Sequence, residues 1–384
     1  MTAVQTLSGK QVVLAVTGSI AAVECVRLVH ALRRKGAEVQ VVMSTAALGI
    51  VTPDALSYAS GRPVITRITG LVEHVTYCGD GGSAALLLIA PCTANTISKI
   101  ACGIDDTPVT TFATTAIGSG MPVLVVPAMH HSMFRHPGLT DNIERLENWG
   151  ICVLPPRIEE GKAKIADIEE IVLASERAVS EKPLAGKRVL ITSGPCREPV
   201  DDVRILTTRS SGMMGKALAL QAFRLGAEVT IVHGDTVPCI TNIHASTADE
   251  MRDAVMSELA ARGGTDIYIS AAAISDFAPV PKEGKIRSGK PAKIDLNPLP
   301  KLLDTVLDEY APFTVAFKIE RNPLAPAKAL LKKGVSLVLM NQPKTMGNAT
   351  GDYQLLSHTG SRRISGTKDA IAAEIWEQIL SEIR

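Results

Sequence analysis

The chain has 384 residues, of which 46% are hydrophobic and 21% charged, and its formal net charge is +1. This length allows two domains of ordinary size, and a charge so close to zero favours small-molecule partners over nucleic acid or a membrane surface. Seven cysteines without a CxxC pair argue against a disulfide framework or a zinc knuckle and indicate a cytoplasmic protein, and no apolar run is long enough to span a membrane.

The two halves of the chain follow one plan of strand, turn, helix and strand. In the first half, "QVVLAVT" (11–17) predicts a strand and "GSIAA" (18–22) a turn, followed by a helix to Lys35 and a second strand from Gly36. The second half repeats the plan with a strand at 188–195, a helix at 215–226 and a strand at 226–234. This repetition predicts an α/β protein with two doubly wound, Rossmann-like domains.

The boundary between the domains is expected within 175–187, where polarity rises and Pro183 and Gly186 interrupt a helix. We therefore assign the domains to residues 1–178 and 187–384. Further short apolar runs predict buried parallel strands at 84–91, 121–128, 265–273, 313–317 and 335–341. Because ligands bind at the carboxyl ends of such strands, the residues after each run are candidates for a binding site.

Four motifs of the first half follow one another in a definite order and are best considered as a set. The turn "TGSIAA" offers backbone N–H groups and the Ser19 hydroxyl at a helix start, which suits one phosphate, although such a turn serves packing equally often. The other motifs are "EH" at Glu73–His74, "APCTANTISKIACGIDD" and "VPAMHHSMF". The set resembles the flavin-dependent cysteine decarboxylases, specifically the phosphopantothenoylcysteine decarboxylases, over about residues 11–175, and implies a flavodoxin-like FMN domain.

The resemblance also implies roles for individual residues. His74 corresponds to the catalytic base, and Met129 and His130 lie in the loop that holds the substrate carboxylate. The implied FMN-binding residues are Gly18, Ser19, Ile20, Ser44, Thr93 and Asn95. FMN would oxidise the substrate thiol to a thioaldehyde, which lets CO2 leave, and would then return the hydride.

This half departs from the family pattern at two places. His130 stands where the family usually has Asn, which implies an imidazole that binds the carboxylate. The family's following flap carries an "A-C-G" cysteine that donates the last proton, whereas residues 155–171 contain no cysteine. We interpret "EEGKAK" as a differently built flap of an archaeal-type member, with Cys152 a weak candidate for the donor.

A metal site at "MHHSMFRH" is not favoured, although three histidines lie within seven positions. His130 and His131 are adjacent and point apart in most backbones, and no cysteine or carboxylate stands at ligand spacing. We interpret His131 and His136 as solvent or turn residues, and Cys92 in the flavin loop as a small packing residue. No metal ligands are therefore assigned.

The second half resembles phosphopantothenate-cysteine ligase, through "TSGPCREPVDDVRILTTRSSGMMGKALA" and five later motifs in family order within 188–343. That family activates 4'-phosphopantothenate with CTP and Mg2+ as an acyl-cytidylate, which L-cysteine then opens. The implied nucleotide-binding residues are Asp276, Lys285, Asn297, Phe317, Lys328 and Lys333, and the implied substrate-binding residues are Arg204, Ser211 and Gly212. Thr208 and Met213 depart from the family's Asn and Lys.

Taken together, the motifs predict a bifunctional enzyme of coenzyme A biosynthesis that ligates 4'-phosphopantothenate to cysteine and then decarboxylates the product to 4'-phosphopantetheine. The resemblance also implies a homo-oligomer, with trimer contacts in the flavin domain and dimer contacts in the ligase domain. Two alternatives remain: an FMN-binding regulatory protein without catalysis, and another flavin-fold enzyme such as a prenyltransferase.

Overall fold

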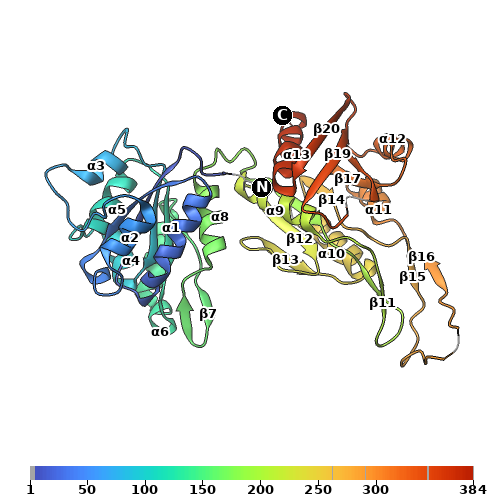
Figure 1. Cartoon of the computed structure of the whole chain (residues 1–384), viewed down its shortest axis with the longest axis horizontal. Coiled ribbons are helices and arrows are strands. Elements are labelled where there is room, and N and C mark those ends of the chain that lie inside the picture. Colours follow the sequence, from blue (N-terminus) through green and yellow to red (C-terminus); the bar gives the residue numbers. More distant parts are fainter. Residues whose placement is uncertain (1–4, 262, 290, 344–345, 384) are drawn as a thin grey trace. The chain divides into compact units, whose positions relative to one another are not determined.

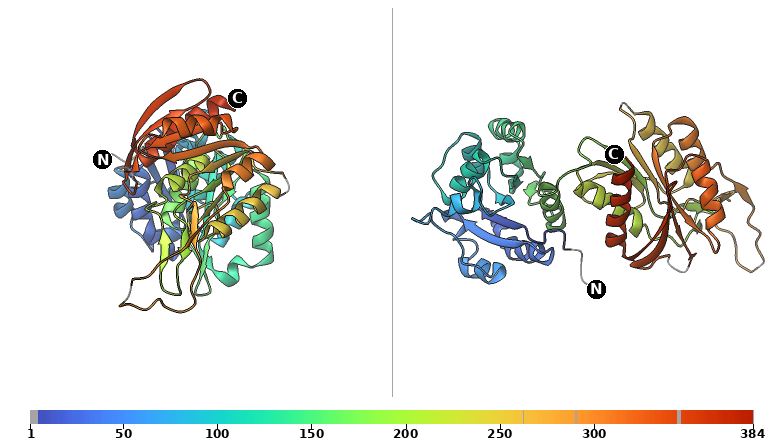
Figure 2. Two further views of the ribbon diagram at one scale, coloured as in Figure 1. Left: turned by 90° about the vertical axis from the view of Figure 1, so that its right-hand side faces the viewer. Right: turned by 90° about the horizontal axis from the view of Figure 1, so that it is seen from above.

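The structure is a computed structural model that describes residues 5–261, 263–289, 291–343 and 346–383 (Figure 1). It divides into two compact units, Met1–Ser180 and Glu181–Arg384. In each unit, helices cover both faces of a largely parallel sheet (Figure 2). The predicted α/β class with two doubly wound domains is confirmed.

The sheet of the first unit has the strand order β2-β1-β3-β4-β6, and all its strands are parallel. The strands are β1 (Gln11–Val16), β2 (Glu38–Met43), β3 (Leu86–Cys92), β4 (Val123–Pro127) and β6 (Cys152–Val153). This is the flavodoxin-like order, in which the order of strand addition reverses between β1 and β3 and leaves a crevice at their carboxyl ends.

Alternating residues of β1 belong to two separate cores, one on each face of the sheet. Val12, Leu14 and Val16 pack with α1 (Cys25–Arg34), α2 (Pro53–Ser60) and α8 (Ile168–Ala178). Val13 and Ala15 pack on the other face. The helices of that second core are α3 (Glu73–Cys78), α4 (Ala94–Ala101), α5 (Pro108–Gly118) and α7 (Pro137–Asn148). Both faces are buried because apolar residues occupy consecutive positions of the strand.

A small antiparallel sheet, β5-β8-β7, lies beside the carboxyl edge of the first unit. It contains β5 (Met129–His130), which precedes the short helix α6 (His131–Phe134), and the hairpin of β7 (Arg157–Glu159) and β8 (Lys162–Lys164). Glu160 and Gly161 form the hairpin turn with φ of 51° and 69°. A two-residue turn with both φ values positive matches the twist of the strands that it joins.

The sheet of the second unit has the order β13-β12-β9-β14-β17-β18-β19-β20, and in the described residues its antiparallel pairings are β18 with β19 and β19 with β20. Its strands are β9 (Arg188–Thr192), β12 (Glu228–His233), β13 (Thr241–His244), β14 (Ile267–Ser270), β17 (Phe313–Ile319), β18 (Leu337–Asn341), β19 (Thr350–Leu356) and β20 (Ser361–Thr367). The first six follow the Rossmann order, with the switch point between β9 and β14.

The helices of the second unit are α9 (Met213–Arg224), α10 (Ala248–Ala260), α11 (Leu302–Glu309), α12 (Leu324–Lys332) and α13 (Lys368–Glu382). Two ribbons extend from its sheet, β10 (Arg197–Pro199) with β11 (Ile205–Thr207), and β15 (Phe277–Pro279) with β16 (Leu296–Pro298) (Figure 1). Asp201 joins them, because its carboxylate accepts hydrogen bonds from the backbone N–H groups of Arg204 (2.7 Å) and Ile286 (3.0 Å).

Candidate functional site

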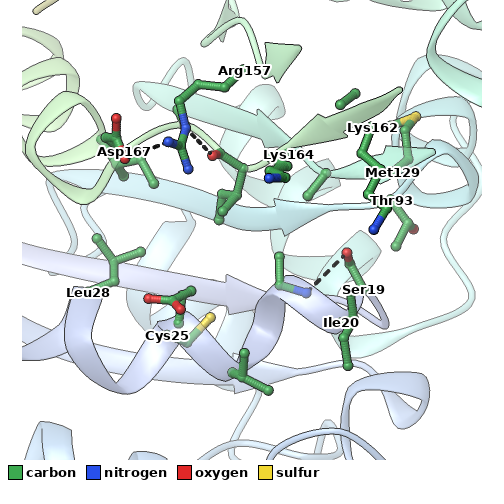
Figure 3. A pocket seen from close by; sticks show the side chains of 18 of the residues that line it. Ser19, Ile20, Cys25, Leu28, Thr93, Met129, Arg157, Lys162, Lys164 and Asp167 are labelled. Atoms are coloured by element: carbon green, nitrogen blue, oxygen red, sulfur yellow. Dashed lines mark hydrogen bonds and ion pairs between the residues drawn. The ribbon is translucent and has the colours of Figure 1, made fainter. Parts of the chain in front are cut away.

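A cavity of about 940 Å³ lies at the carboxyl edge of the first sheet (Figure 3). Its walls are the loops that follow β1, β3 and β4, the hairpin β7–β8, and parts of α1 and α8. The residues of the expected site that line it are Gly18, Ser19, Ile20, Thr93, Met129 and His130. The structure therefore brings the loops expected to bind flavin and substrate, from three separate stretches of sequence, to one cavity.

The loop after β1 is shaped by close backbone packing. Ser19 begins the 3-10 helix η1 (Ile20–Glu24), and its hydroxyl accepts a hydrogen bond from the Ala21 N–H at 3.5 Å. A Cβ on Gly18 would lie 2.5 Å from the Cβ of Ala46, so only glycine fits there without movement. The helix start leaves backbone N–H groups that suit a phosphate group.

Two of the expected flavin residues lie outside this cavity. Ser44 follows β2 and is buried, and its hydroxyl has no hydrogen-bond partner in the described part of the chain. Asn95 is exposed in the first turn of α4. An orphaned buried hydroxyl at the carboxyl edge, beside a cavity of the size that takes a cofactor, fits FMN, with Ser19 and Thr93 as the residues that would hold it.

His74 lies in the first turn of α3 and does not line the cavity. Its ring is 6.5 Å from the ring of Phe112, a residue of the core on the α5 face. The Nδ1 atom is buried and has no hydrogen-bond partner among the described residues. Beside it, a hydrogen bond from the Thr69 hydroxyl lowers the pKa of Glu73. The structure thus places the expected base apart from the other expected residues of its own chain.

His130 begins helix α6 and lines the cavity. Its Nδ1 accepts a hydrogen bond from the Ser132 backbone N–H at 3.3 Å. In the neutral ring the proton is therefore on Nε2, which remains a donor for a carboxylate. The described residues hold no group of three or more His, Cys, Asp or Glu side chains placed to bind a metal ion.

Other residues of the cavity were not singled out as site residues from the sequence. Arg157, Lys162, Lys164 and Asp167 come from the hairpin and the residues after it, within the segment interpreted as a different flap. Cys25 also lines the cavity, but its thiol donates a hydrogen bond to the Ala90 carbonyl at 3.3 Å. Burial raises the pKa of this thiol to about 12, so it stays protonated at neutral pH.

A second cavity, of about 230 Å³, lies at the carboxyl edge of the second sheet. Ser211 and Gly212, both expected from the sequence, line it at the start of α9. Lys216 and Arg197 add positive charge to its lining. Met213, which stands in place of the family's lysine, also lines it, and Lys216 lies three residues later on the same helix face.

His233 lines this second cavity from the end of β12 and is 5% exposed. Its Nε2 contacts the Asn242 Oδ1 at 2.9 Å. The Asn242 amide nitrogen donates to the carbonyl groups of Val237 and Ile240, which fixes the direction of Oδ1. Nε2 must therefore carry a proton. Burial is the largest cause that lowers the pKa of His233.

The expected nucleotide residues do not gather at one place. Asp276 follows β14, and Phe317 lies near the carboxyl end of β17, where its ring is 6.0 Å from that of Tyr353. Lys333 instead ends α12, before the amino end of β18, and its ammonium is 2.8 Å from Asp304. Three more expected residues, Lys285, Asn297 and Lys328, are exposed.

Arg204 does not line the second cavity. Its guanidinium pairs with Asp201 and donates to the Ile286 carbonyl at 3.1 Å. Thr208, which stands in place of the family's asparagine, donates a hydrogen bond to the Ala273 carbonyl at 3.4 Å. The charge of Arg204 thus holds the ribbons of the second unit together, and the cationic groups of the cavity are those of Arg197 and Lys216.

None of the helices in the described ranges is both long and apolar enough to cross a membrane.

Comparison with known proteins assigns both units. Residues 2–180 match the flavoprotein family, and residues 184–383 match the C-terminal domain of DNA/pantothenate metabolism flavoproteins. A coenzyme A biosynthesis bifunctional protein CoaBC of the archaeon Thermococcus kodakarensis is 44% identical over 97% of this chain and 95% of its own. The CoaBC protein of Methanocaldococcus jannaschii is 36% identical over 97% of this chain and 94% of its own.

Solved structures with likeness to single units include the C-terminal domain of a CoaBC protein, at 30% identity and a TM-score of 0.44 over 53% of this chain and 98% of that one. The FMN-dependent cysteine decarboxylase SpaF has 25% identity and a TM-score of 0.39 over 44% of this chain and 99% of its own. The family predicted from the order of the motifs is confirmed by the full-length relatives. The chain belongs to the CoaBC family of bifunctional enzymes of coenzyme A biosynthesis.

Proposed function

We propose that the second unit joins 4'-phosphopantothenate to L-cysteine with CTP, and that the first unit decarboxylates the product with FMN to 4'-phosphopantetheine. The observation that carries the proposal is the cavity of the first unit, in which Ser19, Thr93 and His130 meet. A cofactor site and a carboxylate-binding residue in one cavity are what an FMN-dependent decarboxylation requires.

In the first unit, the N–H groups at the start of η1 and the Ser19 hydroxyl would hold the phosphate of FMN, and the loop that carries Thr93 would contribute to holding the cofactor. The bound flavin supplies a reversible two-electron oxidation of the substrate thiol. His130 donates its Nε2 proton to the substrate carboxylate, because its Nδ1 is occupied by the Ser132 N–H. Cys25 and Leu28 add apolar side chains to the lining of the cavity.

His74 is the base that removes a proton from the substrate. Its buried Nδ1 has no partner in the described part of its own chain, which leaves the ring free to act on a ligand. Because His74 lies at the core opposite to the one beside the cavity, we propose that copies of the chain associate so that His74 of one copy faces the cavity of another. This supports a homo-oligomer, with a trimer as the expected form.

In the second unit, the cavity at the start of α9 suits the phosphate group of 4'-phosphopantothenate. The backbone N–H groups after Gly212, together with Lys216 and Arg197, provide donors and positive charge at one place. Lys216 takes over the charge that the family has at the position of Met213. The substrate is thereby held at the β9–β12 side of the switch point.

The nucleotide binds on the other side of the switch point, beyond β14 and β17, where Asp276 and Phe317 lie. The substrate carboxylate attacks the α-phosphorus of CTP and releases pyrophosphate. The cysteine amine then attacks the acyl carbon and releases CMP. Mg2+ offsets the charge on the triphosphate. The assignment of CTP and Mg2+ rests on the family resemblance and on the acidic Asp276 and aromatic Phe317 at this edge of the sheet.

The test is a mass-spectrometric assay of the purified full-length protein, loaded with FMN, with 4'-phosphopantothenate, cysteine, Mg2+ and either CTP or ATP. We expect 4'-phosphopantetheine and CMP with CTP. Accumulation of phosphopantothenoylcysteine would contradict the decarboxylase half alone. Tight FMN binding without any product from either nucleotide would contradict both halves and support a regulatory protein.

A further inference from the structure

The β7–β8 hairpin directs three cationic side chains to the wall of the first cavity, and two of them are committed to ion pairs. The Lys164 ammonium lies 3.1 Å from Glu159 and 3.1 Å from Glu160, and the hydrogen bond to Glu159 raises the pKa of Lys164. The Arg157 guanidinium lies 3.1 Å from Asp167. Lys162 is the third.

Lys162 has no carboxylate partner within the described ranges of the chain. Its register neighbour on β7 is Glu159, whose carboxylate is already paired with Lys164 and Arg157. Its side chain instead points into the cavity, toward Thr93 (Figure 3). The hairpin thus presents one uncommitted ammonium group to the space where the flavin and substrate are proposed to bind.

The position of Lys162 relative to His130 indicates which atom of the proposed substrate its ammonium group can reach. The two residues are directly opposite each other in the antiparallel pairing of β5 with β8. Cross-strand partners have Cβ atoms about 5 Å apart and point to the same face of the sheet. If His130 holds the substrate carboxylate, the side chain of Lys162 starts beside the carbon that loses this carboxylate.

Replacing a carboxylate by hydrogen requires a proton at that carbon, and the other groups of the cavity supply it poorly. The Cys25 thiol is buried and donates to the Ala90 carbonyl. The Nε2–H of a neutral His130 ring is a weak acid, because giving up this proton would leave an anionic imidazolate. Ionised Glu24, Asp167 and Glu169 are acceptors only. If Lys162 formed an ion pair with the substrate carboxylate, it would stabilise the substrate before CO2 leaves and would not speed the loss of CO2. As a proton donor it would act in the following step, in which the carbon is protonated.

We propose that Lys162 is the general acid that protonates the carbon from which CO2 has left, an inference that rests on the proposed decarboxylation. Loss of CO2 from the thioaldehyde leaves its electron pair on that carbon as an ene-thiolate. This carbon takes a proton from the Lys162 ammonium, which gives a thioaldehyde and a neutral lysine. Bound FMN would supply the remaining chemistry by returning to the thioaldehyde carbon the hydride that it took from the substrate at the start, which gives the product thiolate. Lys162 regains its proton from water.

The experiment uses the full-length, FMN-loaded protein and phosphopantothenoylcysteine without oxygen, and compares Lys162→Met with Lys10→Met, a control at an exposed lysine of the same unit that does not line the cavity. We expect Lys162→Met to release about one CO2 per flavin and then to stop, with the visible absorbance of oxidised flavin lost. The released compound would be two hydrogens lighter than 4'-phosphopantetheine. Steady-state turnover would fall at least about 100-fold, the usual contribution of a positioned acid, while the control would keep its turnover.

Lys162→Arg separates charge from acidity, because a guanidinium keeps the positive charge but does not give up its proton. We expect the same single release of CO2 with this variant. Full turnover of Lys162→Arg or of Lys162→Met would overturn the proposal, as would a Lys162→Met protein that binds FMN but releases no CO2. Failure of the unchanged protein to release CO2 would instead contradict the decarboxylase function itself.

Discussion

The hydroxyl of Thr17 joins the ends of β1 and β3 at the proposed flavin site. It donates to the Pro91 carbonyl at 2.7 Å and accepts from the Thr93 backbone N–H at 3.1 Å, and Thr17 is buried. The loop that carries Thr93 is therefore held against the loop that carries Ser19. The hydrogen bonds of Thr17 thus connect the loops on the two sides of the switch point between β1 and β3.

Thr17→Val should weaken FMN binding and destabilise the first unit. The valine keeps the shape but leaves the Thr93 N–H without its partner and leaves the Pro91 carbonyl with the Thr17 backbone N–H alone, which costs about 1–3 kcal/mol of unfolding free energy. Urea unfolding and flavin fluorescence titration measure the two effects. The control is Thr140→Val, an exposed position on α7. An unchanged FMN affinity would show that this link does not shape the cofactor site.

His74→Asn should abolish CO2 release from phosphopantothenoylcysteine, with a loss of at least about 100-fold, because asparagine cannot take up a proton. Ligation should be unaffected, since His74 belongs to the first unit. The measurement follows CO2 and pyrophosphate separately. His136→Asn, at the exposed start of α7, serves as the control. Loss of both activities would contradict the division of labour between the units.

Gly215→Ala should disrupt the proposed phosphate cavity of the second unit. A Cβ there would lie 2.2 Å from the Ser193 Oγ and 2.5 Å from its Cβ, so the loop after β9 must move away from α9. We expect KM for 4'-phosphopantothenate to rise about tenfold, equivalent to about 1.4 kcal/mol. Adding Ser193→Gly removes both clashing atoms and should restore binding in part. A double variant no better than Gly215→Ala would argue against this steric account.

The link between the two ribbons of the second unit should fail only in acid. The Ile286 N–H is the main cause that holds the pKa of Asp201 well below its ordinary value, with help from Val203 and Arg204. A carboxyl with a lowered folded-state pKa contributes stability above its unfolded pKa of about 4, and this contribution is lost as pH falls toward the folded value.

Proteolysis of the ribbons should therefore be constant from about pH 8 to pH 5 and should quicken only below about pH 4. Asp201→Asn should show fast cleavage throughout, since it lacks the charge that pairs with Arg204. Pepsin in acid and thermolysin at neutral pH, each normalised to an unfolded reference substrate at the same pH, provide the measurement with mass-spectrometric mapping of cuts within 200–206. Equal cleavage of the variant and the unchanged protein at pH 7 would show that Asp201 does not hold the ribbons.

Sequence periodicity determined the α/β class and the repeated plan, because a buried parallel strand needs a short run of apolar residues whatever surrounds it. Motif order determined the family, and local chemistry determined that Gly18 and Ser19 begin a helix beside a cavity. These properties depend on residues that are close together in the chain.

Which side chains share a cavity was decided only by the tertiary structure. Lys162 faces Thr93 because a two-residue turn sets the register of β8 against β7 and β8 then pairs with β5, and Lys216 joins Arg197 because α9 begins at the edge where β9 ends. The same fold left Lys333 beside Asp304 and kept His74 out of the cavity of its own chain. A lysine in a sequence carries the same charge wherever it stands, and only strand register and sheet order determine which ligand it can reach.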